Sequence, residues 1–169
     1  NNLTGNLRIG VIPSALLDIS ELLNQFVSKY RNINIQVFSM SSNKIEENLH
    51  DFKLDIGFTY LENEPLMSVE KLPLYKEKYF LVTNKKSYQS QTSIPWSECH
   101  GIDLCLISPE NQFRRILNSI FLKKNISPNV LIESNSLIHL FSHVSSSSLS
   151  TIMPGSFAKQ FNFNNEISF

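Results

Sequence analysis

Hydrophobic periodicity over residues 7–60 constrains the fold of this chain more than any other feature of its sequence. Short apolar or alternating runs, which are typical of strands, take turns with apolar residues at helical spacing. Strands are expected at 7–12, 33–37 and 54–60, and helices at 16–30 and 41–49. Strand, helix, strand, helix, strand in this order predicts a parallel sheet with crossover helices.

A second α/β segment follows a polar stretch at 84–92. Further strands are expected at 69–74, 78–83, 103–107, 130–133 and 150–153, with helices led by Pro109 and running through Leu137. This repeat predicts an α/β protein of two lobes, the first over 1–83 and the second over 84–162. In such architectures, ligands lie where strand ends and helix N-termini face a cleft.

The composition excludes several classes of protein. Formal net charge is zero, with 15 basic and 15 acidic residues, whereas a surface that grips duplex DNA needs a basic excess. No apolar run approaches the roughly 18 residues that cross a bilayer. The opening residues lack the basic start and long apolar core of a signal peptide. Cys99 and Cys105 are too few for a disulfide framework and are typical of free thiols in a reducing cytoplasm.

Hydroxyl side chains stand at the expected starts of both first-lobe helices. Ser14 follows the first strand and Ser42 opens the second helix, where backbone amides and the positive end of the helix dipole stabilise an anion. A plain N-cap explains the same residues, so both interpretations stay open. Thr59 ends the third strand, either at the cleft edge or simply because strands favour β-branched residues.

Polar residues also mark the start of the first helix in the second lobe. Pro109 and Asn111 bring the backbone of this turn toward the expected cleft. Gln112, Arg114 and Arg115 lie near the helix N-terminus. Arginine suits bidentate recognition of a carboxylate, but adjacent helical residues point about 100° apart. We therefore expect one of the two arginines to lie on a solvated or dimer face.

Several segments together resemble the effector-binding domain of LysR-type transcriptional regulators. GNLRIGVIP, IQVFSMSSNKIEENL and LDIGFTYLENEPL are similar to its first lobe, and VEKLPLYKEKYFLV looks like the crossing into its second. DLCLISPENQFRRILNSIF, IESNSLIHLFSHV and STIMP recur in one branch of that family. The resemblance covers residues 5–154 in the right order and spacing.

The resemblance implies a two-lobed type 2 periplasmic-binding-protein-like fold, each lobe a mixed sheet with flanking helices. It implies a small-molecule effector held between the lobes and DNA bound only through a helix-turn-helix upstream of this chain. Relatives form homodimers or homotetramers, and helix 16–30 would then pack near helix 112–124 of a partner. Relatives also return to the first lobe, so 163–169 is expected to begin that return.

Position in the predicted fold and resemblance to the family together suggest the effector contacts. Ser14 and Ser42 match positions that contact effector in relatives, whose usual residue at the second position is Thr or Ser. Relatives usually have glycine at the positions of Ser147 and Leu149, or glycine and tryptophan in this branch, so the loop that borders the cleft is expected to be reshaped. The expected contacts are Pro13, Ser14, Ser41, Ser42, Thr59, Asn111, Gln112 and Ser148.

Other functions have weaker support. A solute receptor of the same fold, serving a transporter, is the main alternative. No GxSxG elbow, glycine-rich phosphate loop or metal cluster indicates an enzyme. His139 and His143 have a metal-compatible spacing that packing also explains. A redox role for the cysteines is disfavoured because Cys105 lies in an expected buried strand. We expect a cytoplasmic, non-enzymatic sensor of a small anion, without metal, cofactor or membrane segment.

Overall fold

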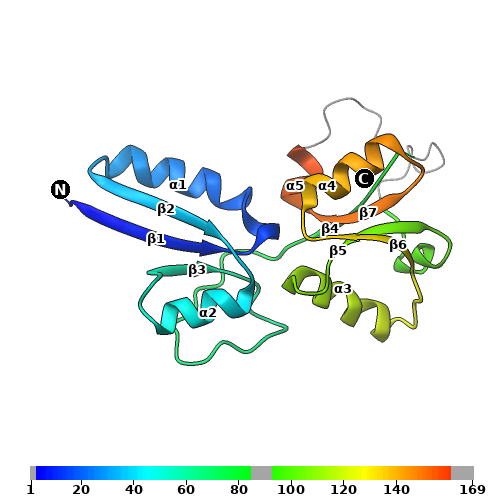
Figure 1. Cartoon of the computed structure of the whole chain (residues 1–169), viewed down its shortest axis with the longest axis horizontal. Coiled ribbons are helices and arrows are strands. Elements are labelled where there is room, and N and C mark those ends of the chain that lie inside the picture. The colour runs from blue at the N-terminus through cyan, green and yellow to red at the C-terminus, as the bar shows by residue number, and fades with distance from the viewer. Residues whose placement is uncertain (1–2, 85–92, 161–169) are drawn as a thin grey trace. The chain divides into compact units, whose positions relative to one another are not determined.

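The computed structural model describes residues 3–84 and 93–160 (Figure 1). The chain divides into two compact units, Asn1–Tyr75 (unit 1) and Lys76–Phe169 (unit 2). Each unit has its own sheet and its own helices. The predicted α/β class with two sheets is therefore confirmed.

Unit 1 is built on a parallel sheet of three strands in the order β2-β1-β3. The strands are β1 (Gly5–Val11), β2 (Ile33–Ser39) and β3 (Ile56–Phe58), and the helices are η1 (Pro13–Ala15, a 3-10 turn), α1 (Asp18–Lys29) and α2 (Ser42–His50). Figure 1 shows α1 and α2 on opposite faces of this sheet.

Side chains of β1 alternate between the two helices, because successive residues of a strand point to opposite faces. Ile9 and Val11 form a buried cluster with Ile19 of α1. On the other face, Gly10 and Gly57 lie under α2, where an added Cβ would come within 2.4 Å and 2.5 Å of Leu54 and Ile45 side-chain atoms. These two glycines therefore let α2 sit close to the sheet.

Unit 2 is built on a mixed sheet of four strands in the order β4-β7-β5-β6. The strands are β4 (Tyr79–Thr83), β5 (Asp103–Ile107), β6 (Asn129–Ser134) and β7 (Ser150–Pro154), and the helices are η3 (Trp96–His100, a 3-10 turn), α3 (Gln112–Lys123), α4 (Leu137–Ser146) and α5 (Gly155–Gln160). Only β4 runs antiparallel to its neighbour, β7. The sheet has α3 on one face and α4 with α5 on the other (Figure 1).

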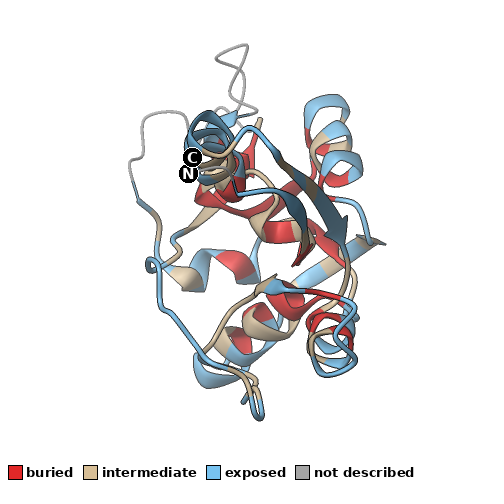
Figure 2. Cartoon of the chain, turned by 90° about the vertical axis from the view of Figure 1, so that its left-hand side faces the viewer, coloured by how far each residue is buried: buried red, intermediate tan, exposed pale blue. Residues whose placement is uncertain are grey.

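The sequence of β5 is apolar from Leu104 to Ile107 because both faces of this strand are buried. Leu104, Cys105, Leu106 and Ile107 are all at most 1% exposed, because helices cover both faces of the sheet. Phe113, Leu117, Leu140 and Val144 complete this core from α3 and α4. Buried residues, red in Figure 2, lie on the sides of the helices that face the sheets.

Two expectations about the fold need correction, the strand at 69–74 and the start of the first helix. The expected strand at 69–74 has no strand structure, and its Leu72 and Leu74 are exposed, because no other strand pairs with it. The second compact unit begins at Lys76 and includes β4, which pairs with β7 along its whole length. Helix α1 begins at Asp18, so Ser14 belongs to the preceding 3-10 turn and does not cap α1.

Three short helices, η1, η3 and α5, were not expected from the sequence. The supposed return segment at 163–169 lies outside the described residues, as does most of the polar stretch 84–92. Within residues 3–84 and 93–160, no helix combines the length and apolarity that a membrane crossing requires.

Candidate functional site

The carboxyl ends of three parallel strands bring the first-lobe candidates to one edge of unit 1. Val11, Ser39 and Phe58 lie side by side in the register of the sheet. Two backbone hydrogen bonds continue this edge, from Ile12 N to Phe58 O (3.1 Å) and from Met40 N to Val11 O (3.0 Å). The residues that follow these strand ends are Pro13 and Ser14 after β1, Ser41 and Ser42 after β2, and Thr59 and Tyr60 after β3.

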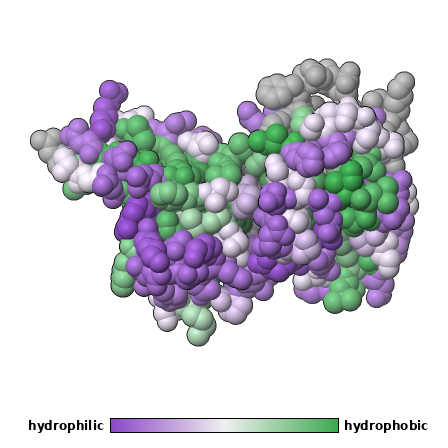
Figure 3. Space-filling view, in the orientation of Figure 1, coloured by the Kyte–Doolittle hydropathy of each residue, from purple (hydrophilic) through white to green (hydrophobic). Residues whose placement is uncertain are grey.

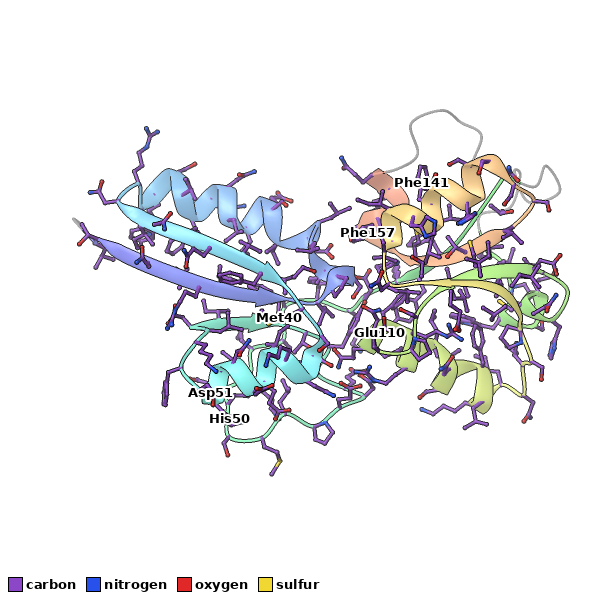
Figure 4. All side chains as sticks on the ribbon, viewed as in Figure 1. Met40, His50, Asp51, Glu110, Phe141 and Phe157 are labelled. Atoms are coloured by element: carbon purple, nitrogen blue, oxygen red, sulfur yellow. The ribbon has the colours of Figure 1, made fainter. Side chains whose placement is uncertain are left out.

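An apolar cluster packs against the residues of this edge. Ile12, Ile45 and Leu54 are buried together, and Met40 and Tyr60 pack against them. Met40 lies just ahead of α2, and His50 and Asp51 lie at its far end (Figure 4). The start of α2 is thus fixed against the edge, while its outer surface is hydrophilic (Figure 3).

Ser14 is 2% exposed and lies in the 3-10 turn η1, whose N-cap is Ile12. The turn is closed by a backbone hydrogen bond from Ala15 N to Ile12 O, 3.0 Å long. The first turn of α1 carries Asp18 and Glu21, and acidic residues there complement the helix dipole. Ser14 therefore sits at the edge without being a helix cap.

At the start of α2, one serine caps the helix and the next serine contacts a carboxylate. Ser41 is the N-cap, and its hydroxyl oxygen accepts a hydrogen bond from Lys44 N at 3.4 Å. Ser42, the first helical residue, is 2% exposed. Its hydroxyl donates a hydrogen bond of 2.8 Å to the Oε2 atom of Glu64. A carboxylate of the chain itself thus accepts the hydrogen bond that the Ser42 hydroxyl donates.

Thr59 follows β3 directly and is half-buried. It therefore belongs to the same edge as Ser14 and Ser42 and is not a residue of the regular strand, which ends at Phe58. All five first-lobe candidates, Pro13, Ser14, Ser41, Ser42 and Thr59, meet at this edge.

In unit 2, the segment between β5 and α3 carries the other predicted contacts. Asn111 is the N-cap of α3 and is 6% exposed, and Gln112 is 2% exposed. The Asn111 side-chain amide donates to Ser108 O at 3.3 Å. Glu110, labelled in Figure 4, accepts a 2.6 Å hydrogen bond from the Ser108 hydroxyl. That hydrogen bond lowers the pKa of the Glu110 carboxyl below its usual value.

Ser148 lies at the opposite end of the second sheet. Strand β7 runs parallel to β5, with Ser150 in register with Leu104 near the start of β5. Ser148 precedes β7, whereas Asn111 and Gln112 follow the carboxyl end of β5. The structure therefore does not bring Ser148 together with the other second-lobe candidates.

The edge of unit 2 also holds residues to which the sequence assigned no role. Ser136 caps α4 by accepting from His139 N at 3.4 Å. Glu77 accepts a 3.1 Å hydrogen bond from Gly155 N, the first residue of α5. Ser136 could have been found as a hydroxyl directly before an apolar helix, but Glu77 and Gly155 are far apart in the sequence.

The two adjacent arginines of α3 have separate structural partners. Arg114 is 8% exposed and donates to Ile107 O at 3.0 Å and to Glu133 Oε1 at 2.6 Å. Arg115 donates to the carbonyl oxygens of Pro109 and Glu110 at 3.1 Å and 2.8 Å. These contacts make both arginines part of the framework that holds the start of α3.

The weaker candidates have structural explanations too. His139 and His143 pack edge to face, with ring centroids 4.6 Å apart, and no group of three or more His, Cys, Asp or Glu side chains in the described part of the chain could hold a metal. Cys99 and Cys105 are free and buried. Burial raises the pKa of the Cys105 thiol to about 11, which makes a reactive thiolate unfavourable.

Comparison with known proteins supports the fold and identifies the family. Residues 1–168 match the model of the LysR substrate binding domain. The chain is 27% identical over 116 residues to the uncharacterized HTH-type transcriptional regulator YybE of Bacillus subtilis (strain 168), which covers 68% of this chain and 39% of that protein. The chain thus spans well under half the length of this curated relative.

Two solved structures with bound small molecules have the same fold. The effector binding domain of QuiR in complex with shikimate has a TM-score of 0.77 and 24% identity, covering 93% of this chain and 78% of that one. The Synechocystis PCC6803 CcmR regulatory domain in complex with 2-PG has a TM-score of 0.83 and 15% identity, covering 98% and 79%. Together with the family match over almost its full length, these similarities show that the chain belongs to the LysR substrate-binding domain family.

Proposed function

We propose that this chain is the effector-sensing domain of a LysR-type transcriptional regulator and that it binds a small anionic metabolite at the carboxyl edge of unit 1. The carrying observation is the contact of the buried Ser42 hydroxyl with the Glu64 carboxylate. This position at the start of a helix already holds a carboxylate oxygen, and hydroxyl donors and helix dipoles both favour such a group.

The relatives agree with an effector of this class. The QuiR domain was solved with shikimate, a carboxylate that also carries hydroxyl groups. Five neighbouring candidates at the edge of unit 1 include four hydroxyl side chains, those of Ser14, Ser41, Ser42 and Thr59. A small hydroxylated carboxylate matches the chemistry of such an edge. The segment 108–112 of unit 2 is a second candidate surface, because Asn111 and Gln112 supply amide groups there.

DNA binding would reside outside this chain. The curated relative is described as an HTH-type regulator, whereas the present sequence has no net charge, which is unsuited to gripping a polyanion. The domain would act in the cytoplasm as a regulator, not as an enzyme. A receptor role in solute transport is the alternative, and a helix-turn-helix encoded upstream would decide for the regulator.

Self-association is part of the same proposal. Helix α1 exposes Leu22 (49%) and Val27 (47%), and α3 exposes Leu122 (79%). Exposed apolar side chains on both helices suit the expected pairing of α1 with α3 of a second copy. Sedimentation velocity should show a dimer at high protein concentration, and only monomer at every concentration would contradict this pairing.

The effector proposal is tested by calorimetric titration with shikimate and with inorganic phosphate. The double variant Ser14→Ala, Ser42→Ala should bind at least about tenfold more weakly than the wild type, because a hydrogen bond to a charged group contributes about 1.5–3 kcal/mol. Ser28→Ala is the matched control, since Ser28 is an exposed serine of α1 whose hydroxyl donates to Asn24 O of the same helix. Equal affinity in the folded double variant and the control would place the anion elsewhere.

A further inference from the structure

Glu64 differs from the other acidic residues of its segment in what it contacts. Its Oε2 atom lies 2.8 Å from the hydroxyl oxygen of Ser42, across 22 residues of sequence. Glu64 is half-buried, whereas Glu62 in the same segment is exposed. The Glu64 carboxylate therefore makes a tertiary contact with the start of α2.

The segment that carries Glu64 is attached to α2 at a second point. The backbone N–H of Met67 donates a 2.8 Å hydrogen bond to Oε1 of Glu46, one helical turn after Ser42. Residues 64–67 thus run along the first turns of α2. The Met67 hydrogen bond does not involve the Glu64 side chain, so displacing the Glu64 carboxylate from Ser42 does not by itself break this second attachment.

Lys44, the lysine of α2, pairs with a carboxylate other than that of Glu64. Lys44 Nζ lies 2.9 Å from both carboxylate oxygens of Glu47, on the solvated face of α2. The remaining candidates of the edge, from Pro13 to Thr59, are uncharged. A second carboxylate brought to the Ser42 hydroxyl would meet the Glu64 carboxylate that already accepts its hydrogen bond, and like charges at such a short distance repel each other.

We propose that Glu64 is a specificity-determining residue: a resident carboxylate that competes with an anionic effector for the Ser42 hydroxyl. An anion binds there only by displacing the Glu64 side chain, and a neutral hydroxylated ligand can bind beside it. This inference rests on the proposed function, because it presupposes that the effector reaches the edge of unit 1.

The test compares Glu64→Gln with the matched control Glu62→Gln, again by titration with shikimate and inorganic phosphate. Glutamine keeps an oxygen that accepts the Ser42 hydrogen bond but removes the charge. Glu64→Gln should bind both anions about tenfold more tightly than the wild type, and Glu62→Gln should bind them as the wild type does. Thermal unfolding of each variant checks that the fold is kept.

A double-mutant cycle separates competition at Ser42 from a general charge effect. In the Ser42→Ala background, Glu64 loses its anchor and the gain from Glu64→Gln should shrink. Equal affinities in the wild type and Glu64→Gln, or equal gains in Glu64→Gln and Glu62→Gln, overturn the inference while leaving the proposed function. If neither the wild type nor Glu64→Gln binds either anion, the proposed anion site fails, and the inference fails with it.

Discussion

Arg8 and Asp55 join β1 to the start of β3 through side chains and backbone together. The Arg8 guanidinium donates a hydrogen bond to Asp55 Oδ1 at 2.8 Å, and the backbone N–H of Arg8 donates one to Asp55 Oδ2 at 2.7 Å. The backbone N–H of Asp55 returns a 2.9 Å hydrogen bond to Arg8 O. We call this set of Arg8–Asp55 hydrogen bonds the clip. Because β3 has only three residues, the clip helps set the register that brings Thr59 to the edge of unit 1.

The first prediction concerns the pH dependence of this clip. The side-chain hydrogen bond from Arg8 lowers the pKa of Asp55 from 3.8 to about 2. A depressed pKa in the folded state contributes stability that is complete above about pH 4 and is lost as the pH falls toward 2. In Arg8→Ala, the Asp55 pKa should return toward 3.8, as measured by carboxyl ¹³C NMR titration.

The carboxyl of Asp51 serves as an internal control for that titration. Its pKa is lowered by the hydrogen bond from Lys53 and does not depend on Arg8. It should therefore stay unchanged in Arg8→Ala. A wild-type Asp55 that titrates near pH 4 would show that the clip does not hold in solution.

The close approach of α2 to the sheet predicts a large cost for Gly57→Ala. The new Cβ would lie 2.5 Å from Ile45 Cγ2 and 3.1 Å from Leu49 Cδ1, and overpacking of this kind typically costs about 1–3 kcal/mol. Urea denaturation of Gly101→Ala gives the comparison, since an added Cβ there meets nothing within 4 Å. Similar free energies of unfolding for both variants would contradict the packing described here.

Arg114 and Glu133 form an ion pair whose two side chains differ in exposure, 10% for Arg114 and 46% for Glu133. Arg114→Met should destabilise unit 2 by about 2 kcal/mol, because it removes the hydrogen bonds to Ile107 O and Glu133 together. Glu133→Gln should cost less than about 1 kcal/mol, since an exposed partner contributes little. The order of the two chemical-denaturation midpoints checks this, and the reverse order would contradict it.

Burial predicts that both cysteines are inert toward thiol reagents in the folded protein. Cys105 is 0% and Cys99 is 3% exposed, and burial raises the pKa of both thiols. Titration with a chromogenic disulfide at neutral pH should show almost no reaction before denaturant is added and two thiols per chain afterwards. Rapid modification of either residue in the native state would reopen a redox role.

The sequence by itself determined the type and order of most elements, because hydrophobic periodicity is a local signal. The strand Asp103–Ile107 matches its predicted bounds, since a strand covered on both faces is apolar at every position. The meeting of Ser14, Ser42 and Thr59 at one edge was also predictable, because the carboxyl ends of parallel strands lie together. The family was recognisable from motif order and spacing and is confirmed.

Only the tertiary structure decided which segments pair and which side chains meet across long stretches of sequence. Residues 69–74 have a strand-like pattern but form no strand, whereas β4 pairs with β7. The register of β7 on β5 placed Ser148 at the far end of the sheet. The contact of Glu64 with Ser42 has no local signature, since it depends on how the segment after β3 folds back along α2.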